Sequence, residues 1–285
     1  MIQASLVFSI MVFAVKVATA TLPALEVVFF RGLLGTLMLT FLIVRKKVSF
    51  LGKPEQRRRL LLRGTAGFLA LSLHFYTISL LPLGTAVLLN YLAILFVALF
   101  AALFIGERPG AFLVSMILVA FAGVYLLAGS QAGAGPGQGL AIFLGILSAV
   151  FAAVAVLTIR VIGHRESPLT VIFYFTGISA VGSLFYLPLG FRWPDWREAV
   201  ALLVVAVGSF YGQLWMTMAY RRAPASLVAP FAYLTPLLSF LYGVLFWKET
   251  LTVANATGAG LIALSGIGIC VSESRRGRKP AFETA

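Results

Sequence analysis

Four polar side chains interrupt long apolar stretches of the sequence at positions where they can bind a solute. His74 and Asn90 stand in the first half of the chain, and Gln213 and Thr235 stand in the second half. An amide or imidazole that is removed from water must find hydrogen-bond partners. These groups therefore favour hydrogen bonding to a polar ligand, and the alternative is that they join neighbouring helices to one another.

Three aromatic side chains lie close to these polar positions in the sequence. Tyr91 directly follows Asn90, and Trp215 and Tyr233 occupy comparable places in the second half. An aromatic ring can line a binding cavity or pack against neighbouring helices, and the sequence leaves both roles open. We include all three in the predicted substrate cavity.

Three charged residues stand near the start of the chain within otherwise apolar stretches: Lys16, Glu26 and Arg31. We expect Lys16 and Glu26 to form an ion pair between two helices, which would leave Arg31 free to attract a carboxylate. The alternative is that Lys16 and Arg31 extend their charged ends to the edge of the apolar layer. If the function involves protons, Glu26 and His74 are the groups able to carry them.

The sequence contains no pattern typical of an enzyme or a metal centre. It has two histidines and one cysteine, Cys270, which cannot form an intrachain disulfide or a multi-ligand metal site. We find no glycine-rich phosphate loop, no paired carboxylates in apolar stretches and no nucleophile–base arrangement. We therefore predict no catalytic residue, no metal and no cofactor.

The composition indicates that these residues belong to a membrane protein. Hydrophobic residues make up 61% of the 285 positions, charged residues make up 11%, and the mean hydropathy is +1.02. A soluble domain has about 45–50% apolar and about 25% charged residues, so one globular core could not bury this much apolar surface. Residues 1–20 lack the basic segment that begins a signal peptide, so we predict a first transmembrane helix there.

Ten apolar segments are long enough to cross a membrane as helices, which takes about 20 residues each. They are residues 2–20, 26–44, 64–81, 84–105, 110–128, 139–159, 169–190, 199–220, 226–246 and 251–271. QAGAGPGQG (131–139) is a flexible glycine-rich linker between the first five segments and the last five. The sequence therefore predicts an all-α integral membrane protein with ten transmembrane helices.

The distribution of positive charge predicts which ends of these helices face the cytoplasm. With the N-terminus inside, 17 of the 22 lysines and arginines fall on the cytoplasmic side, and only Arg192, Arg197 and Lys248 fall outside. Cytoplasmic loops are normally enriched in these residues. The net charge of +13 therefore reflects membrane topology rather than nucleic-acid binding, and the basic stretch 45–63 is expected to lie near anionic lipid headgroups.

One segment of the first half recurs in the second half at an offset of 142 residues. LPLGTAVLLNYLAILFVALFAALFIGE (81–107) aligns without a gap with APASLVAPFAYLTPLLSFLYGVLFWKE (223–249), and Tyr91 and Glu107 meet identical residues. The offset carries the fourth span onto the ninth, and because five is odd, the second copy crosses the membrane in the opposite direction. This predicts a 5+5 inverted repeat, an arrangement that recurs in secondary transporters.

The repeated segment also predicts local structure. Pro230 and Pro236 are expected to interrupt the ninth span and let it bend around a ligand, because proline frees backbone carbonyls. Glu107 and Glu249 precede the fifth and tenth spans, where the helix dipole favours a negative charge. Thr250 is expected to cap the tenth span.

The order and spacing of several short motifs resemble a known family. The motifs are FFRGLLG (29–35), LGTA (83–86), GER (106–108) and KET (248–250). With ten spans in two halves, the chain resembles the drug/metabolite transporter superfamily, EamA type, over nearly its whole length. The resemblance implies a carrier of the bacterial inner membrane with cytoplasmic termini. Such carriers usually export amino acids or related metabolites, and some members take up nucleotide-like compounds or sugars.

These observations combine into one functional expectation and its rivals. We expect a secondary transporter that exports amino acids or related small metabolites by alternating access. The alternatives are efflux of drugs or toxic cations, for which only Glu26 offers a cavity carboxylate, and uptake of a nucleotide-like or sugar metabolite. The inverted repeat and the missing catalytic set disfavour an enzyme or an assembly partner.

The predicted organisation follows from the same segments. Residues 1–129 form a first EamA-type five-helix repeat, 130–138 the linker, 139–272 a second such repeat and 273–285 a basic cytoplasmic tail. The predicted partners are a small-molecule substrate and the lipid bilayer, without nucleic acid. The chain is expected to act as a monomer or a homodimer.

Overall fold

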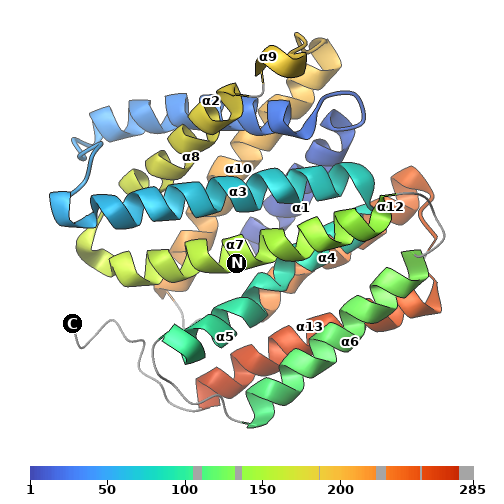
Figure 1. Cartoon of the computed structure of the whole chain (residues 1–285). Coiled ribbons are helices and arrows are strands. Elements are labelled where there is room, and N and C mark those ends of the chain that lie inside the picture. Colours follow the sequence, from blue (N-terminus) through green and yellow to red (C-terminus); the bar gives the residue numbers. More distant parts are fainter. Residues whose placement is uncertain (105–110, 132–136, 186, 223–228, 251, 276–285) are drawn as a thin grey trace.

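The computed structural model describes residues 1–104, 111–131, 137–185, 187–222, 229–250 and 252–275 (Figure 1). Up to residue 131 the helices are α1 (Ile2–Ala18), α2 (Ala24–Arg45), α3 (Arg57–Leu80), α4 (Leu83–Tyr91), α5 (Ala93–Phe104) and α6 (Ala111–Gln131). From residue 138 they are α7 (Gln138–Ile162), α8 (Pro168–Leu184), α9 (Leu187–Gly190), α10 (Trp196–Arg222), α12 (Leu234–Trp247) and α13 (Val253–Arg275). Three short 3-10 helices, η1 (Pro54–Gln56), η2 (Gly163–Arg165) and η3 (Ala229–Tyr233), lie between them.

Each of the ten predicted spans is helical where the structure describes it, which confirms the predicted all-α fold. The fourth span is divided into α4 and α5, and the ninth consists of η3 followed by α12. The third span differs most from its prediction, because α3 begins at Arg57 rather than at residue 64. The last seven residues of the loop assigned to the cytoplasm therefore belong to a helix.

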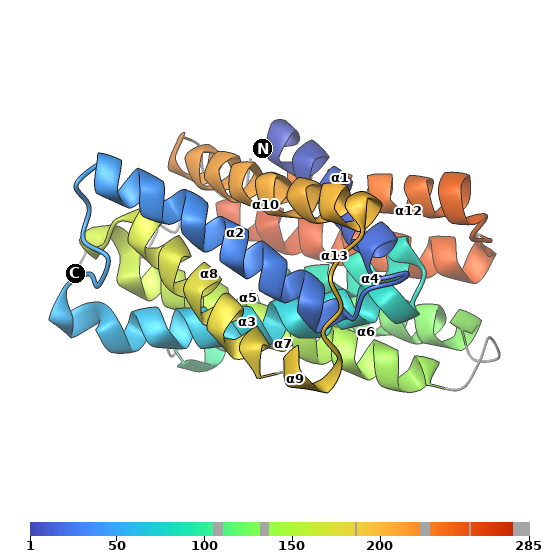
Figure 2. The same cartoon turned by 90° about the horizontal axis from the view of Figure 1, so that it is seen from above.

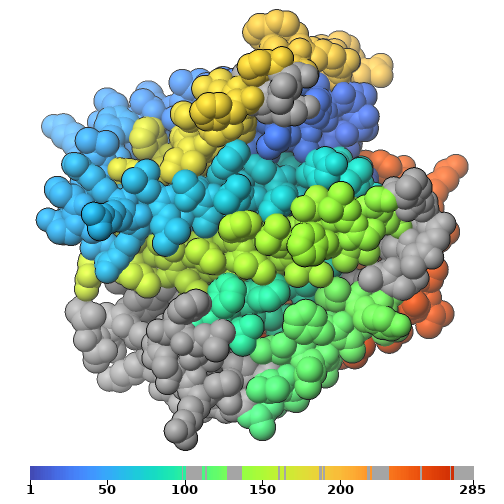
Figure 3. All heavy atoms as spheres, in the orientation of Figure 1, coloured from blue at the N-terminus to red at the C-terminus, as the bar shows by residue number. Residues whose placement is uncertain are grey.

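The outer surface of the helix bundle is apolar, as contact with lipid requires. On α2, the exposed side chains of Leu33, Leu37 and Phe41 follow one another at every fourth position and so form one stripe. By length and composition alone, three described helical stretches can cross a membrane: α2, residues 138–159 of α7 and residues 196–216 of α10. The remaining apolar helical stretches in the described chain are shorter. Figure 3 shows the face of the molecule that α3 and α7 form together.

Helices from the two halves pack in pairs that repeat when the halves are exchanged (Figures 1 and 2). α1 packs on α10 as α7 packs on α3, α12 packs on α1 as α5 packs on α7, and α10 packs on α2 as α3 packs on α8. Two further pairs, α2 with α8 and α6 with α13, each join two helices that the 142-residue offset relates, and α4 with α12 joins the fourth span to the ninth. The packing therefore has the approximate two-fold symmetry that an inverted repeat produces.

The fourth and ninth spans change their helix geometry at equivalent positions. α4 ends at Tyr91 and α5 begins at Ala93, and between them the Leu92 N–H donates to the Leu89 carbonyl oxygen (3.1 Å), which is the tighter spacing of a 3-10 turn. In the ninth span, the 3-10 helix η3 ends at Tyr233 and α12 follows. Because Tyr91 is equivalent to Tyr233, the repeat extends from the sequence to the backbone conformation.

Proline explains only part of this break. Pro230 lies within η3, so the ninth span is interrupted there as predicted. Pro236 lies in the first turn of α12, where a helix has no use for the missing N–H, and the expected interruption at this position is wrong. The fourth span breaks at Leu92 without any proline.

Two helix starts differ from the prediction. Glu249 accepts a hydrogen bond from the Leu83 N–H through either carboxylate oxygen (3.0 and 3.2 Å), so it caps α4 rather than the tenth span. Thr252 Oγ1 accepts from the Asn255 N–H (3.2 Å), so Thr252 rather than Thr250 caps α13. The equivalent of Glu249 in the first half, at position 107, lies outside the described residues.

Candidate functional site

The two helix breaks meet at a pair of tyrosine rings. The ring centroids of Tyr91 and Tyr233 are 5.4 Å apart, and the ring planes are inclined by 50°. Tyr233 is buried, and its hydroxyl lies over Gly266 of α13, where any side chain would overlap it. Because the 142-residue offset relates Tyr91 to Tyr233, the two halves contribute equivalent residues to this contact.

Two of the predicted cavity residues, Thr235 and Trp215, have contacts that the structure describes. Thr235 Oγ1 donates to the Ser5 carbonyl oxygen (3.2 Å), and Ser5 Oγ donates to the Phe231 carbonyl oxygen in η3 (3.0 Å). The Trp215 ring lies with its centroid 5.7 Å from that of Tyr211. The contacts with Ser5 are those that helix packing requires of Thr235, and they fasten α1 to the break in the ninth span. The contact of Trp215 lies within α10 and leaves both of its roles open.

A second polar centre joins α2, α3, α8 and α10. The guanidinium carbons of Arg31 and Arg63 lie 4.9 and 4.7 Å from the centre of one ring, that of Phe175. Arg31 Nε donates to Ser209 Oγ (2.7 Å), and the Ser209 hydroxyl donates to Met11 Sδ (3.0 Å). We call Arg31, Arg63, Phe175 and Ser209 the arginine cluster.

The arginine cluster is costly for the folded chain. Arg31 is 4% exposed and Arg63 is 7% exposed, and neither forms an ion pair with a carboxylate of the described residues. Moving an ion out of water costs several kcal/mol even after the protein relaxes. Stacking a cation on an aromatic ring returns about 0.5–2 kcal/mol, so the contact with Phe175 does not offset the burial of either charge.

Sequence reasoning included Arg31 but missed Arg63 and Phe175. Arg63 closes a run of basic residues, and such a run predicts a cytoplasmic loop. A signal was nevertheless present, because Leu60, Arg63 and Gly67 follow the spacing of one helix face, and all three are buried on α3. Gly67 is needed there, since a Cβ at this position would meet the Phe175 ring at 2.8 Å.

The remaining predicted cavity residues lie on helices that also carry a residue of the tyrosine pair or of the arginine cluster. His74 is buried on α3, about three turns beyond Arg63, and its Nδ1 has no hydrogen-bond partner among the described residues. Gln213 lies about one turn beyond Ser209 on α10, and Asn90 is half-buried at the end of α4. Their contact with a substrate stays a prediction.

The predicted ion pair between Lys16 and Glu26 is wrong. Lys16 Nζ donates to the carbonyl oxygens of Ile78 (2.9 Å) and Leu81 (2.6 Å) at the end of α3. The charge that acts on Lys16 is that of Glu249. Lys16 thus binds backbone groups that the helix leaves unpaired at its C-terminus, where a positive charge is favoured.

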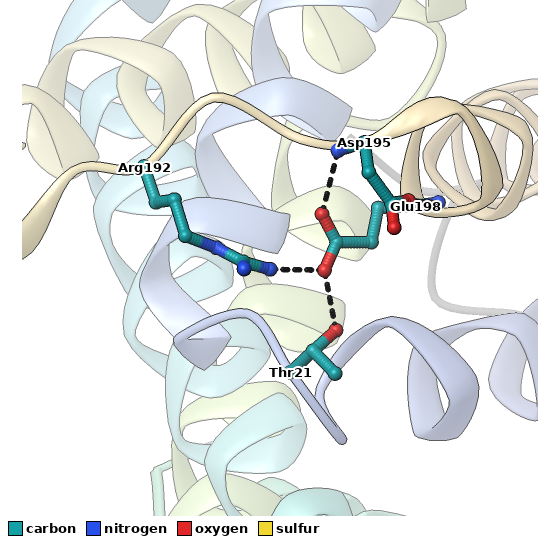
Figure 4. Close-up of polar contacts among 4 residues, drawn as sticks. All are labelled: Thr21, Arg192, Asp195 and Glu198. Atoms are coloured by element: carbon teal, nitrogen blue, oxygen red, sulfur yellow. Dashed lines mark hydrogen bonds and ion pairs between the residues drawn. The ribbon is translucent and has the colours of Figure 1, made fainter.

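Glu26 lies elsewhere, next to a capping network at the start of α10 (Figure 4). It is fully buried, its carboxylate has no side-chain partner among the described residues, and Arg192 and Glu198 are the charges that act on it. Asp195 and Glu198 each accept a hydrogen bond from the backbone N–H of the other (2.7 Å for both), which is a capping box. Glu198 also binds Arg192 and the Thr21 hydroxyl (2.6 Å), so the network is occupied without Glu26.

The comparison with protein families agrees with the fold and its symmetry. The profile of the EamA-like transporter family matches residues 1–129 and again residues 139–271. The chain belongs to the EamA-like transporter family. This membership confirms the resemblance to the drug/metabolite transporter superfamily, and it confirms that the chain is a membrane transporter and not an enzyme.

Known relatives of this EamA-like transporter cover nearly its whole length. The pseudopaline exporter of Pseudomonas aeruginosa is 35% identical over 283 residues, which are 96% of this chain and 94% of the exporter. An uncharacterized transporter of Helicobacter pylori is 28% identical and covers 93% of this chain and 91% of its own. A solved crystal structure with 21% identity superposes with a TM-score of 0.64 over 97% of this chain and 99% of that one, which concerns the fold alone.

Within the described residues of the transporter, no three histidine, cysteine, aspartate or glutamate side chains lie close enough to hold a metal ion. The chemistry that the site residues offer is therefore hydrogen bonding from amide, hydroxyl and imidazole groups, aromatic packing, and charge attraction from two arginines. Each of these binds and orients a solute without breaking a covalent bond.

Proposed function

We propose that this EamA-like transporter is a secondary carrier that exports amino acids or related small metabolites by alternating access. The observation that supports the proposal most is the meeting of two equivalent helix breaks at Tyr91 and Tyr233. Broken helices in corresponding positions of an inverted repeat are typical of substrate sites in secondary transporters. If the two halves exchange their shapes, a site between them opens first to one side of the membrane and then to the other.

The direction of transport and the class of substrate have separate support. The relative from P. aeruginosa bears the name of an exporter. Asn90, Gln213 and His74 offer neutral hydrogen-bonding groups, and Tyr91 and Tyr233 offer aromatic faces. Together these groups suit a zwitterionic or amphipathic solute of small size.

The proposal includes the place of the carrier in the cell. The bias of lysine and arginine toward one side supports cytoplasmic termini in a bacterial inner membrane. Residues 1–129 and 139–272 would then be the two repeats, joined by the linker 130–138 and followed by the basic tail 273–285. The carrier would act on its small-molecule substrate within the bilayer as a monomer or a homodimer.

Counterflow in proteoliposomes tests the carrier function. Vesicles are loaded with a mixed pool of unlabelled amino acids and then receive traces of labelled ones, with and without a pH gradient. We expect transient accumulation of one class of labelled amino acid, because an alternating carrier exchanges its substrate across the membrane. Vesicles without protein are the control. No counterflow for any amino acid, with folded and inserted protein, would refute amino-acid transport in favour of drugs or nucleotide-like substrates.

Alanine at Asn90 or Gln213 is expected to reduce this counterflow about tenfold in each case. A hydrogen bond to a buried polar group contributes about 1 kcal/mol or more, and about 1.4 kcal/mol corresponds to a factor of ten. Thr257→Ala changes an exposed side chain of α13 and is the matched control. Normal counterflow by both site variants, at unchanged expression, would remove these two residues from the site.

Toxic-cation efflux is the second candidate function, and the buried Glu26 carboxylate is the observation that favours it. If it is correct, Glu26→Gln should abolish the resistance to lipophilic cations that the transporter confers on a sensitive host. Glu55→Gln, at an exposed position, is the control. Full resistance with the Glu26 variant would count against cation efflux, because the other described carboxylate among α1, α2 and α10, that of Glu198, already binds Arg192 and Thr21.

A further inference from the structure

The arginine cluster lies well inside the bundle, where two side chains from opposite ends meet. Arg31 is the eighth residue of α2 and Arg63 the seventh of α3, and these helices enter the bundle from opposite ends. At 1.5 Å per residue, their Cα atoms lie roughly 10 Å and roughly 9 Å from those ends. Phe175, on which both guanidinium groups stack, stands near the middle of α8. Both positive charges therefore lie inside the bundle and away from the first turns of their helices.

The hydrogen-bonding capacity of the two arginines is largely unused. A guanidinium group has five N–H donors, and the structure shows one hydrogen bond from Arg31, to Ser209. Arg31 Nη1 and Arg63 Nε are buried without a hydrogen-bond partner in the described part of the chain. Buried N–H groups without a partner favour the binding of a ligand that supplies acceptor oxygens.

The charge of the cluster is also uncompensated by the described residues. Both guanidinium carbons lie within 5 Å of one ring centre, so they are no more than about 10 Å apart, and the charge of each acts on the other. The buried carboxylate of Glu198 binds Arg192, and the half-buried carboxylate of Glu249 binds the Leu83 N–H. The buried carboxylate of Glu26 forms no ion pair with either arginine. Two like charges at this separation in an apolar interior repel each other, and an anion between them would relieve the repulsion.

We propose that the arginine cluster binds the transported substrate through two negative charges, supplied by two carboxylates or by one phosphate monoester. This inference rests on the proposed carrier function and narrows its substrate class. The planar fork of a guanidinium group matches the two oxygens of a carboxylate or a phosphate. Ser209 fixes the orientation of Arg31 through its 2.7 Å hydrogen bond, and the ring of Phe175 supports both guanidinium groups. An anion that binds the remaining N–H donors leaves these contacts intact.

Thermal unfolding of the purified wild-type transporter in detergent provides the first test. Three pairs of probes are compared at matched ionic strength: succinate with succinamide, L-glutamate with L-glutamine, and glycerol phosphate with glycerol. A ligand that binds the folded state raises the midpoint temperature as its concentration rises. We expect at least one anionic probe to raise it and its uncharged or amide counterpart to leave it unchanged.

Arginine variants locate the binding. Arg31→Gln and Arg63→Gln are each expected to weaken the binding of the active anion about 30-fold or more, because each leaves the other charge and the ligand without a partner. Arg31→Lys and Arg63→Lys keep the charge but not the fork, so an intermediate loss is expected. Arg197→Gln is the matched control, since Arg197 also stacks on a ring, that of Trp196 at 5.3 Å, but is exposed.

The outcomes separate this inference from the carrier function. If succinate or glutamate raises the midpoint temperature of the wild type but not that of Arg31→Gln or Arg63→Gln, the cluster recognises carboxylates. If glycerol phosphate raises it more, the cluster recognises a phosphate monoester. Equal effects of every anion and its counterpart on the wild type would overturn the inference, even if neutral amino acids still show counterflow. Counterflow of no solute at all would instead overturn the carrier function. Because the wild-type comparison decides first, a variant that fails to fold does not rescue the proposal.

Discussion

Gly32→Ala should lower the free energy of unfolding of the transporter by about 2–3 kcal/mol, the upper range for overpacking a buried contact. A Cβ at Gly32 would lie 2.6 Å from the Ala180 backbone nitrogen and 3.0 Å from the Thr176 carbonyl oxygen. These are backbone atoms of α8, which cannot turn aside as a side chain can. The variant therefore forces α2 and α8 apart along their whole contact.

Gly177→Ala is the matched control for this prediction. It lies on α8 within a turn of the same contact, but a Cβ there meets no other atom within 4 Å. Alanine favours a helix over glycine by about 1 kcal/mol, so this variant should be as stable as the wild type or slightly more stable. Denaturant or thermal unfolding in detergent measures both. Equal stability of the two variants would show that α2 and α8 are not held together as closely as described.

The same substitution is expected to impair transport, because the α2–α8 contact also positions the arginine cluster. Arg31 precedes Gly32, and Phe175 precedes the Thr176 that Gly32 touches. Separating the helices moves the guanidinium group away from the ring on which it stacks. The FFRGLLG motif thus combines a charged residue with the glycine that lets its helix approach the partner. This combination explains in physical terms why arginine and glycine stand next to each other in the motif.

The architecture could be predicted from the sequence because each signal is local and repeated. Apolar runs of about 20 residues mark the spans, and the 142-residue offset relates Tyr91 to Tyr233 without any knowledge of the fold. The offset also relates positions that proved to share a helix break, although the fourth span has no proline there. A backbone feature can therefore be encoded by the common packing of two repeats rather than by one residue type.

Side-chain partners could not be predicted in the same way. Lys16 and Glu26 are opposite charges on consecutive spans, which favoured pairing, but the free carbonyl oxygens of Ile78 and Leu81 at the end of α3 take Lys16 instead. Backbone groups at helix ends carry no mark in the sequence. Glu249 was assigned to the helix that follows it, whereas the end of α12 lies beside the start of α4 and offers the Leu83 N–H.

Arg63 shows a different limit of sequence reasoning. Charged residues lower the hydropathy of a segment, so the basic run before residue 64 predicts a loop, although α3 begins at Arg57. A helix can carry one buried arginine if its neighbours provide glycine and an aromatic ring, as Gly67 and Phe175 do here. Those partners come from the same helix and from a helix of the other half, and only the fold brings them together.

The second large effect is expected at Glu249, which joins three parts of the chain at one end of the bundle. Its carboxylate caps α4 at Leu83, lies against Gly243 of α12, and provides the charge that acts on Lys16 of α1. Glu249→Ala leaves the Leu83 N–H without its acceptor and Lys16 without its counter-charge. A buried donor left unsatisfied costs about 1–3 kcal/mol, so we expect a loss of stability of about that size from the missing cap.

Glu249→Gln should behave differently, and its effect depends on pH. Burial raises the pKa of the Glu249 carboxyl above its ordinary value of 4.5, and the Leu83 N–H and the Lys16 charge oppose this shift only in part. Well below pH 4.5 the wild-type side chain is protonated in both the folded and the unfolded chain, and glutamine resembles it. As the pH rises toward the raised pKa, the unfolded wild type releases its proton first, so the wild type loses stability while the glutamine variant does not.

The expected signature is therefore a stability difference between Glu249→Gln and the wild type that grows in favour of glutamine as the pH rises above 4.5. It should level off once the folded carboxyl is ionised, because the proton balance between the folded and unfolded states is then equal. Glu249→Ala should stay below glutamine at every pH, since only glutamine keeps an acceptor for the Leu83 N–H. Unfolding midpoints across this range measure all three proteins, with Glu55→Gln as the exposed control. A pH-independent difference between glutamine and wild type would mean that the carboxylate is solvated rather than held between α4 and Lys16.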